Sequence, residues 1–257
     1  VEKNRSRSVI YASTPSADSE AALLTSSSAS EYAPSFLPGT DKIVFLAPEE
    51  NGSGAMQIWS MNADGTGRKQ VSFEAEGVDD YLFSPCGNKV ILIKGVAHEA
   101  SIQKNDEDLA LSTGIVANDL MYKHWDHYTK SAPHPFVADF DGNKVSGAKD
   151  LLEGEPYESP MLPFGGAEQL AWSPDGKQIA YTCRKLSGID YAISTDSDIF
   201  LYDIESGETK NLCKPEGYVR PVCDPTRSLK NQAVNQFQED VNAGYDQNPQ
   251  FSPDGKY

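Results

Sequence analysis

Short alternating apolar runs, each bounded by polar turn residues, recur along the chain and predict strands rather than long helices. A phrase related to Ser-Pro-Asp-Gly-Lys occurs four times, and an apolar run follows each of the first three copies along the chain. In this phrase Pro presets one backbone angle of a tight turn and Gly permits a positive one. An aromatic residue before each turn can point into a core. The copies are Phe83–Lys89, Trp172–Lys177, Phe251–Lys256 and the degenerate Phe36–Lys42.

A second predicted hairpin follows three of these copies. Two hairpins per repeat give four antiparallel strands, which is the content of one β-propeller blade. We therefore expect an all-β fold, a β-propeller of four-stranded antiparallel blades. The strands of the second hairpins are Gln57–Met61 returning at Gln70–Ser72, Pro135–Asp139 returning at Leu151–Leu152, and Asp198–Tyr202 returning at Lys210–Leu212.

The spacing of the repeats divides the chain into blades and insertions. We expect a half blade at 1–30, a blade at 31–76, blades with insertions at 77–165 and 166–244, and the start of the next blade at 245–257. This is a partial ring of about three full blades plus two half blades. Either the two halves complete one another in a small closed ring, or the chain is part of a larger propeller, which we favour.

Charge limits the partners that this chain can bind. The formal net charge is −16, from 22 basic and 38 acidic residues. Binding to phosphate needs clustered Lys and Arg, so nucleic acid and anionic membrane surfaces are poor partners. The apolar runs are too short to cross a bilayer. An acidic surface can attract a cationic ligand such as the free amino end of a peptide, although solubility alone also explains it.

Several phrases of the sequence are more specific than the repeat. The segment Asp119–Asp126, followed by His134–Asp139, resembles the propeller of bacterial dipeptidyl peptidase V-like enzymes, which belong to the prolyl oligopeptidase family of serine peptidases. The likeness spans about Ser8 to Tyr257. Further phrases that carry it are Glu31–Pro34, Met61–Thr66, Glu153–Glu158 and Ser197–Ile199.

The resemblance implies a second domain. Enzymes of this family follow the propeller with an α/β-hydrolase domain whose nucleophilic serine sits in a Gly-x-Ser-x-Gly elbow. No such phrase occurs in these 257 residues, so the hydrolase domain is absent from this chain and no catalytic residue is assigned in it. The chain alone is expected to be inactive.

The expected function follows from the same resemblance. The chain is expected to be the propeller region of a periplasmic or secreted serine exopeptidase that releases dipeptides from the amino end of oligopeptides, gating and orienting substrate for the hydrolase domain. That domain acts through an acyl-enzyme, and the full protein is a possible homodimer. The alternative is a non-enzymatic periplasmic β-propeller binding module of the translocation-associated repeat type.

Candidate substrate contacts lie in and after the first insertion. In related enzymes, propeller carboxylates hold the free amino end of a peptide through charge-assisted hydrogen bonds. The candidates here are Asp126, Glu155 and Glu158, with Tyr122 and Trp125 as walls. Each of these acids has an alternative interpretation as a solvated surface acid or a bond between blades.

Neither a metal nor a cofactor is expected. The spacing of His124 and His127 around Asp126 suggests a metal site, but no further ligand cluster accompanies them. No Cys-x-x-Cys pair occurs. Cys213 and Cys223 flank one loop and form a possible disulfide in an oxidising compartment, with two free thiols as the open alternative.

Overall fold

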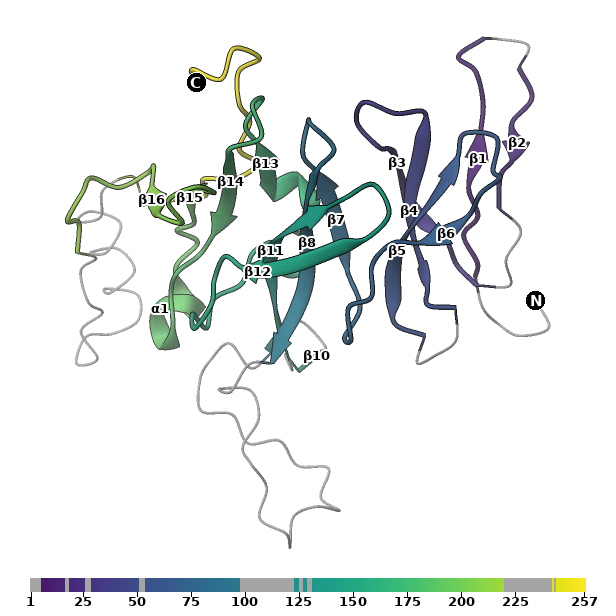
Figure 1. The fold of residues 1–257 in the computed structure, drawn as a ribbon. Coiled ribbons are helices and arrows are strands. Elements are labelled where there is room, and N and C mark those ends of the chain that lie inside the picture. Colours follow the sequence, from purple (N-terminus) through teal and green to yellow (C-terminus); the bar gives the residue numbers. More distant parts are fainter. Residues whose placement is uncertain are drawn as a thin grey trace, which may run out of the picture. The chain divides into compact units, whose positions relative to one another are not determined.

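The structure is a computed structural model that describes residues 6–16, 19–25, 29–50, 54–97, 123–124, 127–128, 131–219, 242 and 244–257. The chain divides into two compact units. Unit 1 comprises Val1–Lys94 and Phe136–Lys149, and unit 2 comprises Gly95–Pro135 and Asp150–Tyr257. The described elements are almost entirely strands, and Figure 1 labels most of them.

The first four-stranded sheet lies in unit 1 and has the order β3-β4-β5-β6. Its central strands pair in antiparallel register, with Phe45 opposite Trp59. Because successive side chains of a strand point to opposite faces, both faces of this sheet bury apolar residues. The hairpin of β1 and β2 precedes it. The strands are β1 (Tyr11–Ala12), β2 (Ala22–Leu23), β3 (Tyr32–Phe36), β4 (Lys42–Pro48), β5 (Met56–Asn62) and β6 (Lys69–Gln70).

Two apolar clusters in unit 1 account for the burial of these faces. One cluster contains Val44 and Leu46 of β4 together with residues of the second sheet, such as Val90 and Phe140. The other contains the alternate residues of the same strands, Ile10 from before β1, and Leu24 from after β2. Its members are Ile10, Ile43, Phe45, Ala47, Trp59 and Met61, with Leu24 packed against them. Successive apolar residues of β4 and β5 thus pack into the two clusters alternately, one on each face of the sheet.

The second four-stranded sheet has the order β12-β11-β8-β7. One prediction about it was wrong: its fourth strand is Val145–Asp150, whereas Leu151–Leu152 form a buried turn beyond it. The Asp141 carboxylate accepts hydrogen bonds from the backbone of Asn143 and Lys144, which closes the turn early. The strands are β7 (Asp80–Phe83), β8 (Lys89–Ala97), β11 (Ser131–Phe140) and β12 (Val145–Asp150).

The third four-stranded sheet lies in unit 2 and has the order β13-β14-β15-β16. Tyr181 and Phe200 stack across its central strands at 5.5 Å between ring centroids. A single-turn 3-10 helix, η4, precedes the sheet, and the short helix α1 connects β14 to β15. The elements are η4 (Ala167–Gln169), β13 (Leu170–Trp172), β14 (Gln178–Cys183), α1 (Gly188–Ile193), β15 (Asp198–Asp203) and β16 (Thr209–Asn211). Two further strands of two residues each, β9 (Lys123–His124) and β10 (His127–Tyr128), form a small antiparallel hairpin in which His127 lies opposite His124.

The repeated phrase is a turn closed by its own side chains. Ser173 donates a hydrogen bond to the Asp175 carboxylate at 2.7 Å, and the same oxygen accepts the backbone N–H of Lys177 at 3.1 Å. These bonds hold the pKa of Asp175 below its ordinary value. The copy at Ser252–Lys256 repeats the Ser–Asp bond at 2.7 Å. The phrase therefore serves turn geometry rather than chemistry.

The predicted fold class, an all-β fold of four-stranded antiparallel sheets, is confirmed. Among the described residues, no helix combines the length and the apolar character needed to span a membrane.

Candidate functional sites

Glu158, a predicted substrate contact, lies in the interior of unit 2. Its residue is 0% exposed, and its carboxylate accepts the hydroxyl hydrogen of Tyr191 on α1 at 2.9 Å. Arg184 approaches the same oxygen at 3.8 Å and stacks over the Tyr191 ring at 4.1 Å. Burial, followed by the charge of Glu158, raises the pKa of Tyr191. In this geometry the carboxylate holds α1 and Arg184 in place.

Glu155, the second described candidate, is more accessible. Its side chain is 36% exposed and pairs with Lys185, whose ammonium nitrogen lies 2.8 Å from Oε1 and 2.6 Å from Oε2. Lys185 also lies over the ring of Phe200 at 4.7 Å. The Glu155 carboxylate therefore already binds an ammonium group in the structure.

The remaining candidates fall outside the described residues. These are Tyr122, Trp125 and Asp126, so their role as substrate contacts stays a prediction. The same holds for the disulfide, because Cys223 is not among the described residues. Cys213 itself carries a thiol whose sulfur accepts the backbone N–H of Ile199 at 3.2 Å.

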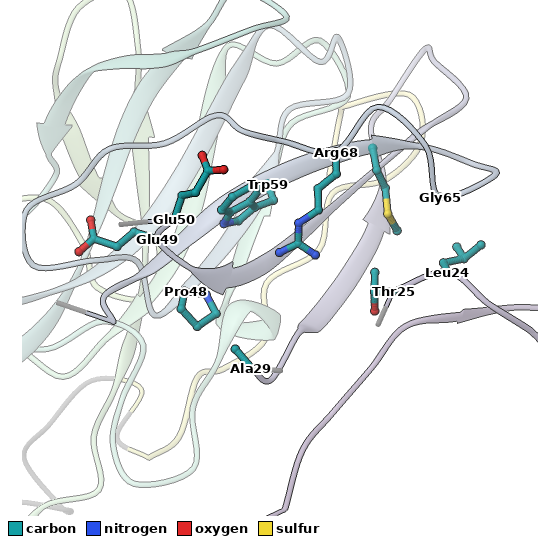
Figure 2. Close-up of a pocket in the computed structure, with 10 residues that line it drawn as sticks. Leu24, Thr25, Ala29, Pro48, Glu49, Glu50, Trp59, Gly65 and Arg68 are labelled. Atoms are coloured by element: carbon teal, nitrogen blue, oxygen red, sulfur yellow. The ribbon is translucent and has the colours of Figure 1, made fainter. Parts of the chain in front are cut away.

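A cavity of about 550 Å³ opens in unit 1 and was not predicted. We call it the Trp59 pocket (Figure 2). It lies between the segment after β2 and the ends of β4 and β5, and it combines an indole, a guanidinium group and two carboxylates. The lining residues are Leu24, Thr25, Ala29, Pro48, Glu49, Glu50, Trp59, Met61, Gly65 and Arg68.

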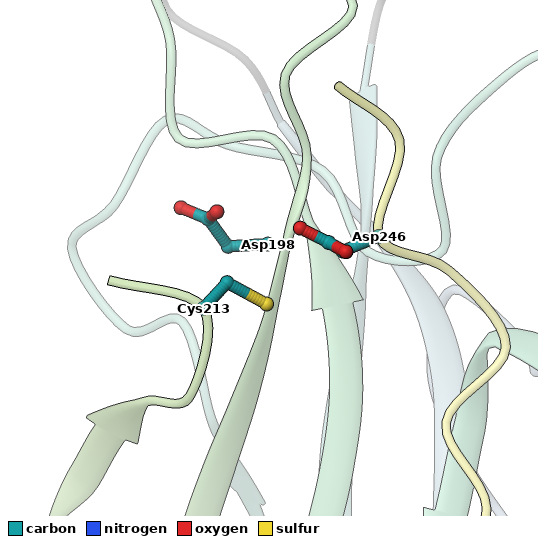
Figure 3. Close-up of side chains that lie close together, drawn as sticks. All are labelled: Asp198, Cys213 and Asp246. Carbon is teal, nitrogen blue, oxygen red and sulfur yellow. The ribbon is translucent and has the colours of Figure 1, made fainter. Parts of the chain in front are cut away.

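A cluster of two carboxylates and a thiol lies beside β15 in unit 2 (Figure 3). Donor atoms of Asp198, Cys213 and Asp246 all lie within 4.8 Å of one another, a set that resembles metal ligands in type. However, the ammonium group of Lys214 lies 3.4 Å from Asp198 and 3.2 Å from Asp196. The chain thus already supplies a positive charge here, and Lys214, Asp196 and Asp198 form a buried ion-pair network beside the partly buried Cys213 and Asp246.

This network fastens the C-terminal segment to the third sheet. The carboxylate of Asp196 accepts the backbone N–H of Gly244 at 3.1 Å, and Lys214 donates to the carbonyl of Asn242 at 2.9 Å. Ser197 and Tyr245 form a parallel bridge next to these contacts. Burial raises the pKa of Asp198, although the bond from Asn211 and the charge of Lys214 act in the opposite direction.

The sequence is similar to curated proteins named dipeptidyl-peptidase 5. The protein of Porphyromonas gingivalis is 40% identical over 233 residues, which covers 91% of this chain and 30% of the relative. The protein of Porphyromonas endodontalis is 37% identical over 234 residues, with the same coverage of 91% and 30%. The predicted resemblance is confirmed. The chain spans about a third of the length of these dipeptidyl-peptidase 5 relatives.

The fold also resembles that of a solved structure. A crystal structure of a puromycin hydrolase mutant matches with a TM-score of 0.50 and 18% identity, covering 82% of this chain and 28% of the hydrolase. At this level of identity the likeness concerns the fold alone. A scan of protein-family models finds none that matches the chain.

Proposed function

We propose that this chain is the propeller region of a periplasmic or secreted serine exopeptidase that releases dipeptides from the amino end of oligopeptides. The observation that carries the proposal is the 40% identity to a protein named dipeptidyl-peptidase 5 over 91% of the chain. The hydrolase domain, with its catalytic serine, is supplied by a part of the protein beyond these residues. The full enzyme acts through an acyl-enzyme.

The role proposed for this region is to gate and orient the substrate. Four-stranded sheets with apolar residues on both faces form a rigid support, and loops on a rigid support commonly carry binding residues. Holding the amino end of a peptide in register with a distant serine supplies several kcal/mol of barrier reduction by positioning alone. No reacting side chain from the propeller is required.

Among the described carboxylates, Glu155 suits the amino end of a peptide better than Glu158. The Glu158 carboxylate is 0% exposed, so a peptide ammonium cannot reach it without opening the contact with α1. The Glu155 side chain is 36% exposed and already accepts an ammonium group from Lys185. A peptide ammonium would share or replace that contact.

Assays on the full-length protein test both the peptidase activity and the role of Glu155 in binding the amino end of the peptide. We expect turnover of a dipeptide p-nitroanilide that a serine-directed reagent abolishes, and none from the present chain alone. Glu155→Gln should raise KM about five-fold, because a charge-assisted bond at a half-exposed site is lost, and should leave kcat unchanged. Glu153→Gln, an exposed acid two residues away, is the matched control.

Each outcome separates one part of the proposal from another. A full-length protein without serine-dependent turnover contradicts the peptidase function and favours the binding module. Turnover with equal KM for Glu155→Gln and Glu153→Gln removes Glu155 as the anchor and leaves Asp126 as the next candidate.

A further inference from the structure

The floor of the Trp59 pocket is apolar and held rigidly. Trp59 and Met61 are 6% and 1% exposed and belong to the apolar cluster that Leu24 completes. The indole N–H of Trp59 donates to the backbone carbonyl of Ala47 at 3.2 Å, which fixes the plane of the ring. A floor that is fixed before binding lowers the entropic cost of taking up an apolar group.

Arg68 supplies a positive charge at one side of this floor. Its guanidinium carbon lies 4.5 Å from the centre of the Trp59 ring and 5.1 Å from that of Phe45. One of its nitrogens pairs with the buried carboxylate of Glu31. Among the residues that the structure describes, no other hydrogen bond to this guanidinium is present. Because guanidinium has five N–H donors, several remain for a carboxylate.

Two acidic residues supply the opposite charge. Glu49 and Glu50 follow directly after β4 and line the pocket. In Figure 2 they lie on one side of Trp59, and Arg68 lies on the other. Glu50 is exposed, and its carboxylate has no bond to another described residue. An ammonium group is the ligand that a carboxylate favours.

We propose that the Trp59 pocket binds a zwitterionic dipeptide with apolar side chains. Its ammonium group meets Glu49 and Glu50, its side chains cover Trp59 and Met61, and its carboxylate meets Arg68. The volume of about 550 Å³ lies within the range of about 300–1,000 Å³ that is typical of small-molecule sites. It leaves room for two residues rather than one.

The ammonium group contributes more to binding than the carboxylate. Glu31 already neutralises part of the charge of Arg68, whereas Glu49 and Glu50 add negative charge to a chain whose net charge is −16. The affinity order is therefore the zwitterion, then the dipeptide amide, then the N-acetyl dipeptide. This order depends only on the pocket. If the peptidase function holds, the ligand is a product of the reaction, which makes the pocket a site for product sensing.

Isothermal titration calorimetry on the full-length protein tests the assignment. The probes are Leu-Phe, Leu-Phe amide and N-acetyl-Leu-Phe. We expect Leu-Phe to bind. Relative to Leu-Phe, the amide should bind about three-fold more weakly and the N-acetyl compound at least about ten-fold more weakly. Glu50→Gln should weaken Leu-Phe about five-fold. Arg68→Lys keeps a cation for Glu31 but loses the planar fork, and should weaken Leu-Phe about three-fold.

Glu76→Gln, an exposed acid of unit 1 outside the pocket lining, is the matched control and should bind like the wild type. Absence of Leu-Phe binding overturns the proposal. Binding that Glu50→Gln and Arg68→Lys leave unchanged also overturns it, because the dipeptide then occupies another site. Calorimetry does not require turnover, so a failed peptidase function leaves this test intact.

Discussion

The charge of Arg68 should stabilise the fold by compensating the buried carboxylate of Glu31. The Glu31 side chain is 0% exposed and pairs with the Arg68 guanidinium. Arg68→Met keeps most of the apolar stem and removes the charge. Removing one partner of a buried ion pair costs about 3–5 kcal/mol, since the other charge is left uncompensated. Losing the stacking on two rings adds about 1 kcal/mol, so we expect the free energy of unfolding to fall by about 5 kcal/mol.

Urea denaturation, followed by circular dichroism, measures this change. Glu31→Gln and the double variant Arg68→Met/Glu31→Gln complete a double-mutant cycle. The double variant should lose less than the sum of the single losses, by about 2 kcal/mol, because a neutral side chain at position 31 no longer needs a cation. A loss below about 1 kcal/mol for Arg68→Met, the range of exposed ion pairs, would refute the reasoning.

The same variant should also differ from the wild type in how its free energy of unfolding depends on pH. A buried carboxylate without its cation is favoured as the neutral acid, so the folded variant binds a proton more tightly than the unfolded chain does. Stability then decreases as the pH rises through the range in which Glu31 loses that proton. The deficit of Arg68→Met relative to the wild type should therefore be smaller at about pH 5 than at about pH 8.

Three further outcomes follow from other contacts. Lys214→Met leaves two buried carboxylates without their cation, so hydrogen exchange in residues 244–246 should accelerate and stability should fall by about 3 kcal/mol. Burial raises the pKa of Cys213 to about 11, so iodoacetamide at about pH 8 should modify it at least ten-fold more slowly than the exposed Cys86, as mass spectrometry would show after reduction. Gly87→Ala should lower the melting temperature more than Gly142→Ala does. Both glycines have positive φ, but of the two only Gly87 would place a Cβ 2.7 Å from a backbone carbonyl oxygen.

The sequence predicted the hairpins well because their information is local. The turn at Ser173–Lys177 is closed by bonds within the phrase itself, and the strands beside it alternate apolar residues. The return strand β12 was missed for the opposite reason. Most of its side chains are solvent-accessible, so it carries no apolar alternation, whereas the buried pair Leu151–Leu152 does not lie in a strand.

The Trp59 pocket could not be predicted from the sequence. Trp59 lies opposite Phe45 only through the pairing of β4 and β5, and Arg68 meets both rings only after β6 returns along β5. No pattern in the neighbouring sequence marks Glu31 as the buried partner of Arg68. The pairing of Glu158 with Tyr191 on α1 is likewise a contact between distant segments.

The order of strand pairing has a consequence for how the chain folds. In the first and third sheets every strand pairs with the next strand of the sequence, whereas β8 pairs with β11 across residues 98–130. The loop-closure free energy of this connection is about 1.4 kcal/mol more unfavourable than that of the connection at 49–55 between β4 and β5. We expect the second sheet to form last and to set the folding rate of the chain, since rates fall as pairing becomes less local. Shortening 98–130 should then accelerate refolding.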